Sequence, residues 1–188
     1  MPATGKSTVA RLLQEEFGFP ILEKDGIKEE LFDTIGFESY EEKRNLDVAA
    51  TAVMLRVLED MMKANSSVIV DNNFSPAAAQ RLQALLETYK PCCVTVFFTG
   101  DVQVLYERYV ERDANHCRHL GHAMQTHYPP HPGESTAFSM TREGFDQRFL
   151  ALSNDKLSWG GEVIRVDATD PDKIDRAALL ARIRQIFE

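Results

Sequence analysis

Short hydrophobic segments alternate with amphipathic segments along nearly the whole chain of 188 residues. Apolar residues at helical spacing predict helices over residues 6–17, 27–32, 40–63, 76–90, 102–112, 141–152 and 172–187. Short apolar runs predict strands over residues 20–22, 67–71, 92–99 and 163–167. Strands that alternate with helices of this length form a parallel sheet covered on both faces. The alternation therefore predicts a three-layer α/β fold.

Local signals mark where several of these helices begin and end. Ser39 and Glu42 have the spacing of a capping box. Pro76 stands at a first helical position, where proline is tolerated, and Asp101 is suited to cap the helix that follows it. Gly18 follows the first helix and is a usual C-terminal signal.

Length, charge and cysteine content limit the class of protein. With 188 residues, 44% of them hydrophobic, the sequence suits one domain over residues 1–188, and no apolar run approaches the roughly 20 residues that cross a membrane. A net charge of −8 opposes the binding of a long nucleic acid strand. Cys92 and Cys93 are adjacent and Cys117 lies apart, so the three cannot all pair within the chain. We expect a cytoplasmic domain with reduced thiols, without a membrane or long nucleic acid as partner.

A phosphate-binding signature lies at the start of the sequence. Residues 1–8 read M-P-A-T-G-K-S-T, which matches all but the first position of G-x-x-x-x-G-K-[ST]. In that motif backbone N–H groups at a helix start hold phosphate oxygens, the lysine reaches the β and γ phosphates, and the serine hydroxyl binds Mg²⁺. The nucleotide-binding candidates are Thr4, Gly5, Lys6, Ser7 and Thr8, with Ser7 also at the metal. The alternative is that Gly5 and Lys6 merely start a helix.

The opening glycine of the motif, and the hydrophobic strand that normally precedes it, would lie before Met1. Two interpretations follow. In the first, the natural product begins further upstream. In the second, the chain is a shortened and inactive descendant. We expect the first, because the remaining sequence keeps the other parts of a phosphate-transfer site.

Two aspartates follow predicted strands, at the end of the sheet where α/β folds bind ligands. Asp25 can accept the proton of a substrate hydroxyl that attacks a γ-phosphate. Alternatively it is the N-cap of the following helix, and one carboxylate can do both. Asp71 closes the run V-I-V-D and can hold Mg²⁺ or position the acceptor. Its alternative role is a turn with Asn72 and Asn73.

Two arginines, Arg108 and Arg112, lie one helical turn apart on the same helix face. Arginines so placed can close over a nucleotide and neutralise charge on the transferred group. Surface pairing with Glu107 and Glu111 is the alternative. We interpret both arginines as nucleotide-binding, and Arg112, together with Lys6 and Asp25, as catalytic as well.

Residues 113–140 lose helical periodicity and contain all five histidines. The segment is long and interrupted by proline, which is typical of a lid that closes on a ligand. The alternative is a zinc site with imidazole and thiolate ligands, although their spacing is irregular. Its candidate ligands are His116, Cys117, His119, His122, His127 and His131. We expect the lid.

In this order, the motifs resemble those of P-loop kinase-like proteins often labelled AAA-domain ATP-binding proteins, relatives of the polynucleotide 5′-kinase domain, chloramphenicol phosphotransferase and zeta toxins. The resemblance extends along nearly the whole chain. It rests on P-A-T-G-K-S-T at 2–8, K-D-x-I-K-E at 24–29, V-I-V-D-N-N-F at 68–74, R-x-x-x-R at 108–112 and R-H-x-G-H at 118–122.

The resemblance implies a P-loop NTPase fold of the kinase-like type, with a parallel sheet and a lid, that uses ATP and Mg²⁺ to phosphorylate a hydroxyl of a small molecule. It implies nucleotide phosphates at residues 5–8, an acceptor-activating carboxylate at Asp25, an acceptor-side or magnesium carboxylate at Asp71, and lid arginines at Arg108 and Arg112. These relatives phosphorylate very different hydroxyls, so the resemblance does not name the acceptor. Two alternatives stay open: a polynucleotide 5′-end kinase, which the negative charge disfavours, and a nucleotide-binding protein without turnover, which the incomplete motif favours.

Overall fold

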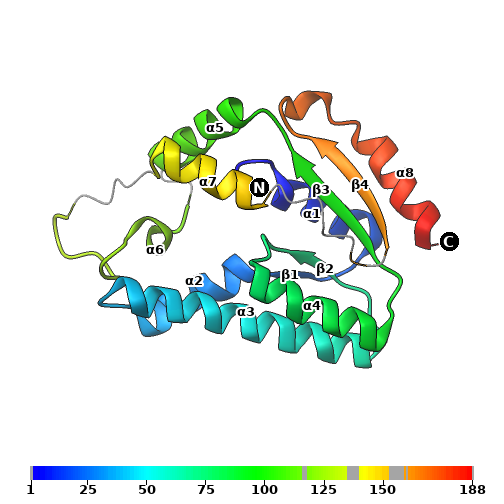
Figure 1. Cartoon of the computed structure of the whole chain (residues 1–188), viewed down its shortest axis with the longest axis horizontal. Coiled ribbons are helices and arrows are strands. Elements are labelled where there is room, and N and C mark those ends of the chain that lie inside the picture. Colours follow the sequence, from blue (N-terminus) through cyan, green and yellow to red (C-terminus); the bar gives the residue numbers. More distant parts are fainter. Residues whose placement is uncertain (1, 116–117, 135–139, 153–158, 160, 188) are drawn as a thin grey trace.

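The computed structural model describes residues 2–115, 118–134, 140–152, 159 and 161–187. Its helices are α1 (Lys6–Phe17), α2 (Lys24–Ile35), α3 (Tyr40–Lys63), α4 (Pro76–Tyr89), α5 (Val102–Ala114), α6 (Leu120–Ala123), α7 (Arg142–Leu152) and α8 (Arg176–Phe187), with a 3₁₀ turn η1 (Pro171–Lys173). Its strands are β1 (Ile21–Glu23), β2 (Ile69–Asp71), β3 (Val94–Thr99) and β4 (Glu162–Asp167). Strands and helices alternate as predicted (Figure 1).

The strands pair in parallel, which confirms the predicted α/β class. β1 lies beside β2, with Ile21 opposite Ile69 and Glu23 opposite Asp71. β3 lies beside β4 along the whole length of both strands. Within the described residues no ladder joins these two pairs, so each strand has one hydrogen-bonded edge. The register brings the carboxyl ends of β1 and β2 together at Glu23 and Asp71.

Helices cover the strand pairs from both sides. α1 and α8 pack on β3 and β4 around a buried cluster that includes Val9, Phe98 and Ile183. α3 and α4 pack together in a second cluster, which includes Leu55 and Leu82 and also takes in residues of β1 and β2. Figure 1 shows α3 and α4 along one side of the molecule and α8 along the other, with the strands between them. This is the predicted three-layer arrangement.

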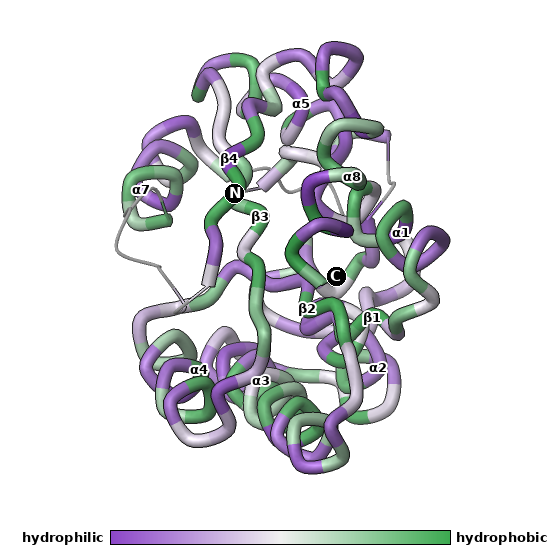
Figure 2. Tube along the Cα trace, turned by 90° about the vertical axis from the view of Figure 1, so that its right-hand side faces the viewer, coloured by the Kyte–Doolittle hydropathy of each residue, from purple (hydrophilic) through white to green (hydrophobic). Residues whose placement is uncertain are grey.

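Hydrophobic positions recur turn by turn along α3 and α4, among hydrophilic ones (Figure 2). Such mixed helices bury one face and expose the other. No helix in the described ranges is long and apolar enough to cross a membrane.

Capping side chains confirm several predicted helix ends. The Ser39 hydroxyl accepts the Glu42 backbone N–H at 3.2 Å, and the Glu42 carboxylate reaches back to a backbone N–H just before the helix. Asp101 accepts the first N–H groups of α5, and Pro76 occupies the first turn of α4. α1 ends at Gly18, whose φ of +70° is the left-handed conformation that glycine adopts easily.

Two helices differ from the sequence prediction at their starts. α2 begins at Lys24 rather than at residue 27, because contacts to α3 fix its first turn. The ammonium of Lys24 forms an ion pair with Asp47 of α3 at 2.8 Å. α8 begins at Arg176 rather than at residue 172, after the separate turn η1. The carboxylate of Asp175 accepts the Ala178 N–H at 2.9 Å and so starts a new helix there.

The predicted lid, residues 113–140, begins inside α5, and its residues 116–117 and 135–139 lie outside the described part of the chain. Its described part packs against α2 and α3. Met124 joins Phe32 and Phe37 in a buried cluster, and Lys43 of α3 donates to the backbone carbonyls of His122 and Met124. Closure of this segment over a ligand stays a prediction. Its described residues pack against α2.

Candidate functional site

The start of α1 is built to receive an anion. Gly5 is the N-cap, with a φ of +76° that favours glycine. The N-cap Gly5 has no side chain that could cap α1, and a helix start of this kind presents backbone N–H groups that suit an anion. Thr4 is buried, and Thr8 is exposed on the first turn. The predicted phosphate-binding residues 4–8 therefore surround one helix start.

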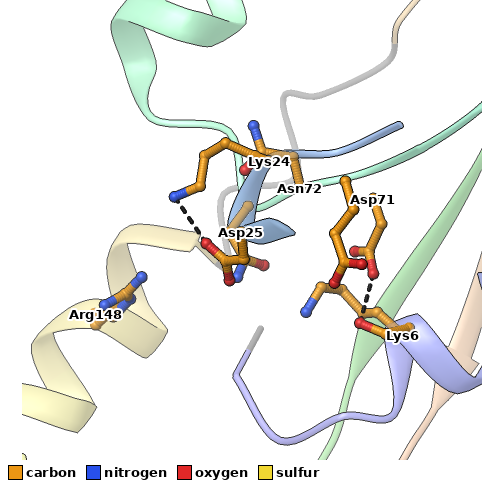
Figure 3. A pocket seen from close by; sticks show the side chains of 9 residues that line it. Lys6, Lys24, Asp25, Asp71, Asn72 and Arg148 are labelled. Carbon is orange, nitrogen blue, oxygen red and sulfur yellow. Dashed lines mark hydrogen bonds and ion pairs between the residues drawn. The ribbon is translucent and has the colours of Figure 1, made fainter. Parts of the chain in front are cut away.

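A pocket opens beside this helix start, at the carboxyl ends of β1 and β2 (Figure 3). Its lining comes from α1, the ends of β1 and β2, the first turn of α2, and α7. The lining residues are Lys6, Ser7, Glu23, Lys24, Asp25, Asp71, Asn72, Asn73 and Arg148. The structure thus brings four of the predicted site residues, namely Lys6, Ser7, Asp25 and Asp71, to one place.

Ser7 and Asp71 are in direct contact. The Ser7 hydroxyl donates to Asp71 Oδ2 at 2.6 Å, although 64 residues separate them. Glu23 lies opposite Asp71 in the strand register, and burial, together with Asp71 and Asp25, raises its pKa. A hydroxyl and a carboxylate that converge in this way are the oxygen donors that Mg²⁺ prefers. The pair fits the predicted metal site.

Asp25 is not the N-cap of α2. The N-cap is Glu23, which makes no side-chain capping bond, and Asp25 lies in the first helical turn. The N-cap alternative is therefore wrong, because the helix starts earlier than its sequence pattern indicates. A carboxylate in the first turn is nevertheless favoured by the helix dipole.

The charge of Asp25 is set by its neighbours. Lys24 Nζ is 3.1 Å from Asp25 Oδ1. Burial alone would raise the pKa of Asp25, but the charges of Lys24, His122 and Lys28 outweigh burial and hold the pKa well below its usual value. Asp25 is therefore ionised at neutral pH. Across the pocket, burial lowers the pKa of Lys6, while the carboxylates of Asp71 and Asp25 act in the opposite direction.

The two predicted arginines lie in different surroundings. Arg108 donates to the backbone carbonyls of Ala168 and Thr169, at 2.5 and 2.6 Å, so it joins α5 to the segment after β4 and does not line the pocket. Arg112 lies close enough to Lys6 and Asp25 for their charges to interact. Its Nε is buried without a hydrogen-bond partner among the described residues. Of the two, only Arg112 is placed near the candidate site.

Arg148 is a site residue that the sequence patterns do not reveal. It belongs to α7, lines the pocket, and acts electrostatically on Lys6. Figure 3 shows its guanidinium across from Lys6 and Asp25. No local motif surrounds Arg148, and only the packing of α7 on α5 brings it to the pocket. The signal that could have found it is its place in the helix predicted over 141–152, directly after the predicted lid.

Three of the described histidines, His119, His122 and His127, lie beside carboxylates. His122 Nε2 is 2.8 Å from Glu29, and His119 Nε2 is 3.0 Å from Asp33. In the described ranges no group of three or more histidine, cysteine or acidic side chains is placed to hold a metal ion. His116 and Cys117, two of the candidate zinc ligands, lie outside those ranges.

Known proteins share this sequence pattern and this fold. Residues 1–128 match the family model described as AAA domain. The structure is similar to the crystal structure of a "putative kinase" from Chloroflexus aurantiacus, with 25% sequence identity and a TM-score of 0.76, over 98% of this chain and 90% of that chain. No curated protein sequence matches the chain.

Proposed function

The chain belongs to the AAA-domain family of P-loop kinase-like proteins, and from this premise we propose that it transfers the γ-phosphate of ATP to a hydroxyl group of a small molecule. One observation carries the proposal. A helix start suited to phosphate, a serine–aspartate pair suited to Mg²⁺ and an ionised aspartate suited to the acceptor line the same pocket. A nucleotide-binding protein without transfer has no need of the third feature.

The nucleotide side of the pocket would be formed by α1 and α7. Backbone N–H groups after Gly5 would hold phosphate oxygens, and the ammonium of Lys6 would face the β and γ phosphates. Arg148 and Arg112 add guanidinium groups that can neutralise charge on the phosphoryl group as it moves. We do not include Arg108, because the backbone carbonyls at 168 and 169 already bind it.

The Ser7 hydroxyl and the Asp71 carboxylate would hold the Mg²⁺ ion that accompanies ATP, since both present oxygen donors at one point. When bound, the ion neutralises phosphate charge and so lowers the barrier to transfer.

The acceptor side of the pocket would be formed by Asp25. In the proposed step the acceptor oxygen bonds to the γ-phosphorus, and the bond from that phosphorus to the β–γ bridging oxygen breaks. ADP leaves with the electron pair of the broken bond. The Asp25 carboxylate accepts a hydrogen bond from the attacking hydroxyl and takes its proton as the phosphate ester forms. Because the pKa of Asp25 is low, it is a weak base, and its main effect is to orient the hydroxyl.

Two features favour a small acceptor. The net charge of −8 opposes a polynucleotide strand. In addition, the α2 helix that carries Asp25 is covered on one side by the segment around His122, whose Nε2 is 2.8 Å from Glu29 of that helix. This cover on one side of α2 favours a compact molecule over a chain, and the Asp25 side chain, 45% exposed, stays accessible to it.

The proposal is tested by measuring binding and transfer separately. ATP·Mg²⁺ binding is measured by calorimetry, and transfer is followed with γ-labelled ATP, using water and a panel of small hydroxyl compounds as acceptors. Asp25→Asn should keep nucleotide affinity but lower transfer by at least ~10²-fold, as expected for a positioned proton acceptor. Glu30→Gln, which removes an exposed carboxylate from the same helix, is the matched control and should leave both unchanged.

Two results would contradict the proposal. One is a parent protein that binds ATP·Mg²⁺ yet transfers phosphate neither to water nor to any hydroxyl in the panel, which would identify a binding protein without turnover. The other is Asp25→Asn protein that transfers at the parent rate.

A further inference from the structure

Asp47 of α3 lies outside the pocket, and its carboxylate forms ion pairs with two lysines beside Asp25. Its Oδ1 lies 2.8 Å from Lys24 Nζ and 2.8 Å from Lys28 Nζ. Both lysines belong to α2, and their side chains are only 13% and 12% exposed. One carboxylate oxygen therefore contacts two nearly buried ammonium groups.

The two lysines differ in how they meet Asp25. Lys24 is shared, because its Nζ is 3.1 Å from Asp25 Oδ1 and 2.8 Å from Asp47 Oδ1. Lys28, one turn further along α2, pairs with Asp47 and makes no ion pair with Asp25 in the described part of the chain. Its charge nevertheless acts on Asp25, so the two groups are near one another.

Removal of Asp47 would leave Lys24 with Asp25 as its carboxylate partner and would take from Lys28 its ion pair. A charge that is largely buried is costly without an opposite charge, and a lysine side chain can reorient around its flexible stem. The other carboxylate whose charge acts on Lys28 is Asp25, which already contacts Lys24. Two lysines would then bind Asp25, and its oxygens would no longer be free to meet another group.

We propose that Asp47 is a positioning residue for phosphate transfer, which holds Lys28 and shares Lys24 so that one oxygen of Asp25 stays free for the acceptor hydroxyl. Asp47 itself touches neither nucleotide nor acceptor. The inference rests on the proposed function, since it takes Asp25 as the residue that meets the acceptor.

Charged groups from several elements act on Asp25. At neutral pH they are Lys24 and Lys28 of α2, Lys6 of α1, Glu23 of β1 and Arg112 of α5. The His122 ring of α6 also lies near Asp25 but is uncharged there, because burial lowers its pKa to about 4. Asp47 pairs with the two lysines of α2 and with none of the other groups among the described residues. Loss of Asp47 should therefore release only the two lysines, and removal of Lys28 as well should restore much of the original charge balance.

This reasoning gives a rescue experiment, with ATP·Mg²⁺ as substrate and water as acceptor. Asp47→Asn should lower the kcat of ATP hydrolysis about 10-fold, and KM for ATP should change by less than about twofold, because orientation of the attacking group is lost and nucleotide contacts are not. Adding Lys28→Met to Asp47→Asn should return kcat to within about threefold of the parent. Asp60→Asn, which removes a carboxylate from the exposed face of α3, is the control and should keep the parent kcat.

A merely structural role for Asp47 gives the opposite result. Lys28→Met would then remove further packing, and the double variant would be slower than Asp47→Asn alone. Such a loss, or a parent-like kcat in Asp47→Asn, would overturn the inference.

A second measurement needs no nucleotide and separates this inference from the proposed function. NMR signals of the lysine ammonium groups are recorded with and without the substitution Asp25→Asn. In the parent, Asp25→Asn should shift the Lys24 signal strongly and that of Lys28 much less, because only Lys24 forms an ion pair with Asp25. In Asp47→Asn protein it should shift both. If Asp25→Asn does not shift the Lys28 signal of Asp47→Asn protein, the role of Asp47 is overturned. If the parent protein fails to bind or hydrolyse ATP, the proposed function alone is overturned.

Discussion

Substitution of Gly121 by alanine tests whether the segment after α5 is docked on α2 as tightly as the structure indicates. A Cβ atom at Gly121 would lie 2.3 Å from Cδ2, 2.9 Å from Cγ and 3.0 Å from Cε2 of Phe32. Carbon atoms in ordinary contact are about 3.5 to 4.0 Å apart. The phenyl ring or α6 must therefore move by roughly 1 Å.

Neither group can move freely. Phe32 is fully buried, and its ring packs against Phe37 at a centroid distance of 5.3 Å and against His122 at 5.7 Å. α6 is tied down by the contact of His122 with Glu29. Overpacking of a filled core typically costs about 1 to 3 kcal/mol. We expect Gly121→Ala to lower the free energy of unfolding by that amount.

Urea unfolding monitored by circular dichroism measures this loss, and amide hydrogen exchange over residues 118–128 shows whether the segment opens. Gly26→Ala is the matched control. Gly26 also lies in a helix but has open space around its Cβ position, so alanine there should stabilise by about 0.5 to 1 kcal/mol. Gly121→Ala protein with the parent's stability and unchanged exchange would refute the docked arrangement.

The remaining predictions concern the buried histidine and the nucleotide side of the pocket. Burial lowers the pKa of His122 from 6.5 to about 4, so between these pH values the folded protein binds fewer protons than the unfolded chain. The free energy of unfolding should therefore fall by about 3 kcal/mol as the pH drops through this window. Urea unfolding of His122→Gln protein should show a smaller fall. An equal fall in both proteins would contradict the lowered pKa of His122. Lys6→Ala should weaken ATP·Mg²⁺ binding about 10-fold to 100-fold, because one charged hydrogen bond is lost. It should therefore remove most of the rise in melting temperature that ATP produces. An undiminished rise would show that Lys6 does not face the phosphates. Arg148→Ala should lower the rate of phosphate transfer at least about 10-fold, with a smaller change in ATP affinity. Arg81→Ala, at an exposed arginine, is the control and should change neither. Equal transfer rates in both variants would exclude Arg148 from the transfer step.

The sequence predicts those features that depend on neighbours along the chain. The capping box of Ser39 and Glu42 forms as its spacing indicates, and the contact between Ser7 and Asp71 follows from two motifs that each end at the same edge of the strands. Chain-local patterns cannot reveal partners that only the packing brings close. Arg148 reaches the pocket through the packing of α7 on α5, and Asp47 reaches Lys24 through the packing of α3 on α2.

The same limit applies to two further sequence patterns, which do not reveal the contacts that the structure shows. The spacing of Arg108 and Arg112 indicates a shared role, yet carbonyl groups 60 and 61 residues further along the chain bind Arg108. The segment 113–140 lacks periodicity because side-chain pairs, such as that of His122 with Glu29, hold its described part in place. Such pairs leave no regular pattern in the sequence.

The division of the strands into two separate pairs bears on how the protein behaves at high concentration. Within the described residues, β2 and β3 each keep one edge without a backbone partner. An open edge can template pairing with another chain, and a two-stranded sheet is barely stable alone. β3 reads V-T-V-F-F-T over residues 94–99, an uncharged run of β-branched and aromatic residues without proline, which is the composition of segments that stack into fibrils. We therefore expect the protein to self-associate through β3 as its concentration is raised, which light scattering can measure. A lysine placed within that strand should slow the association.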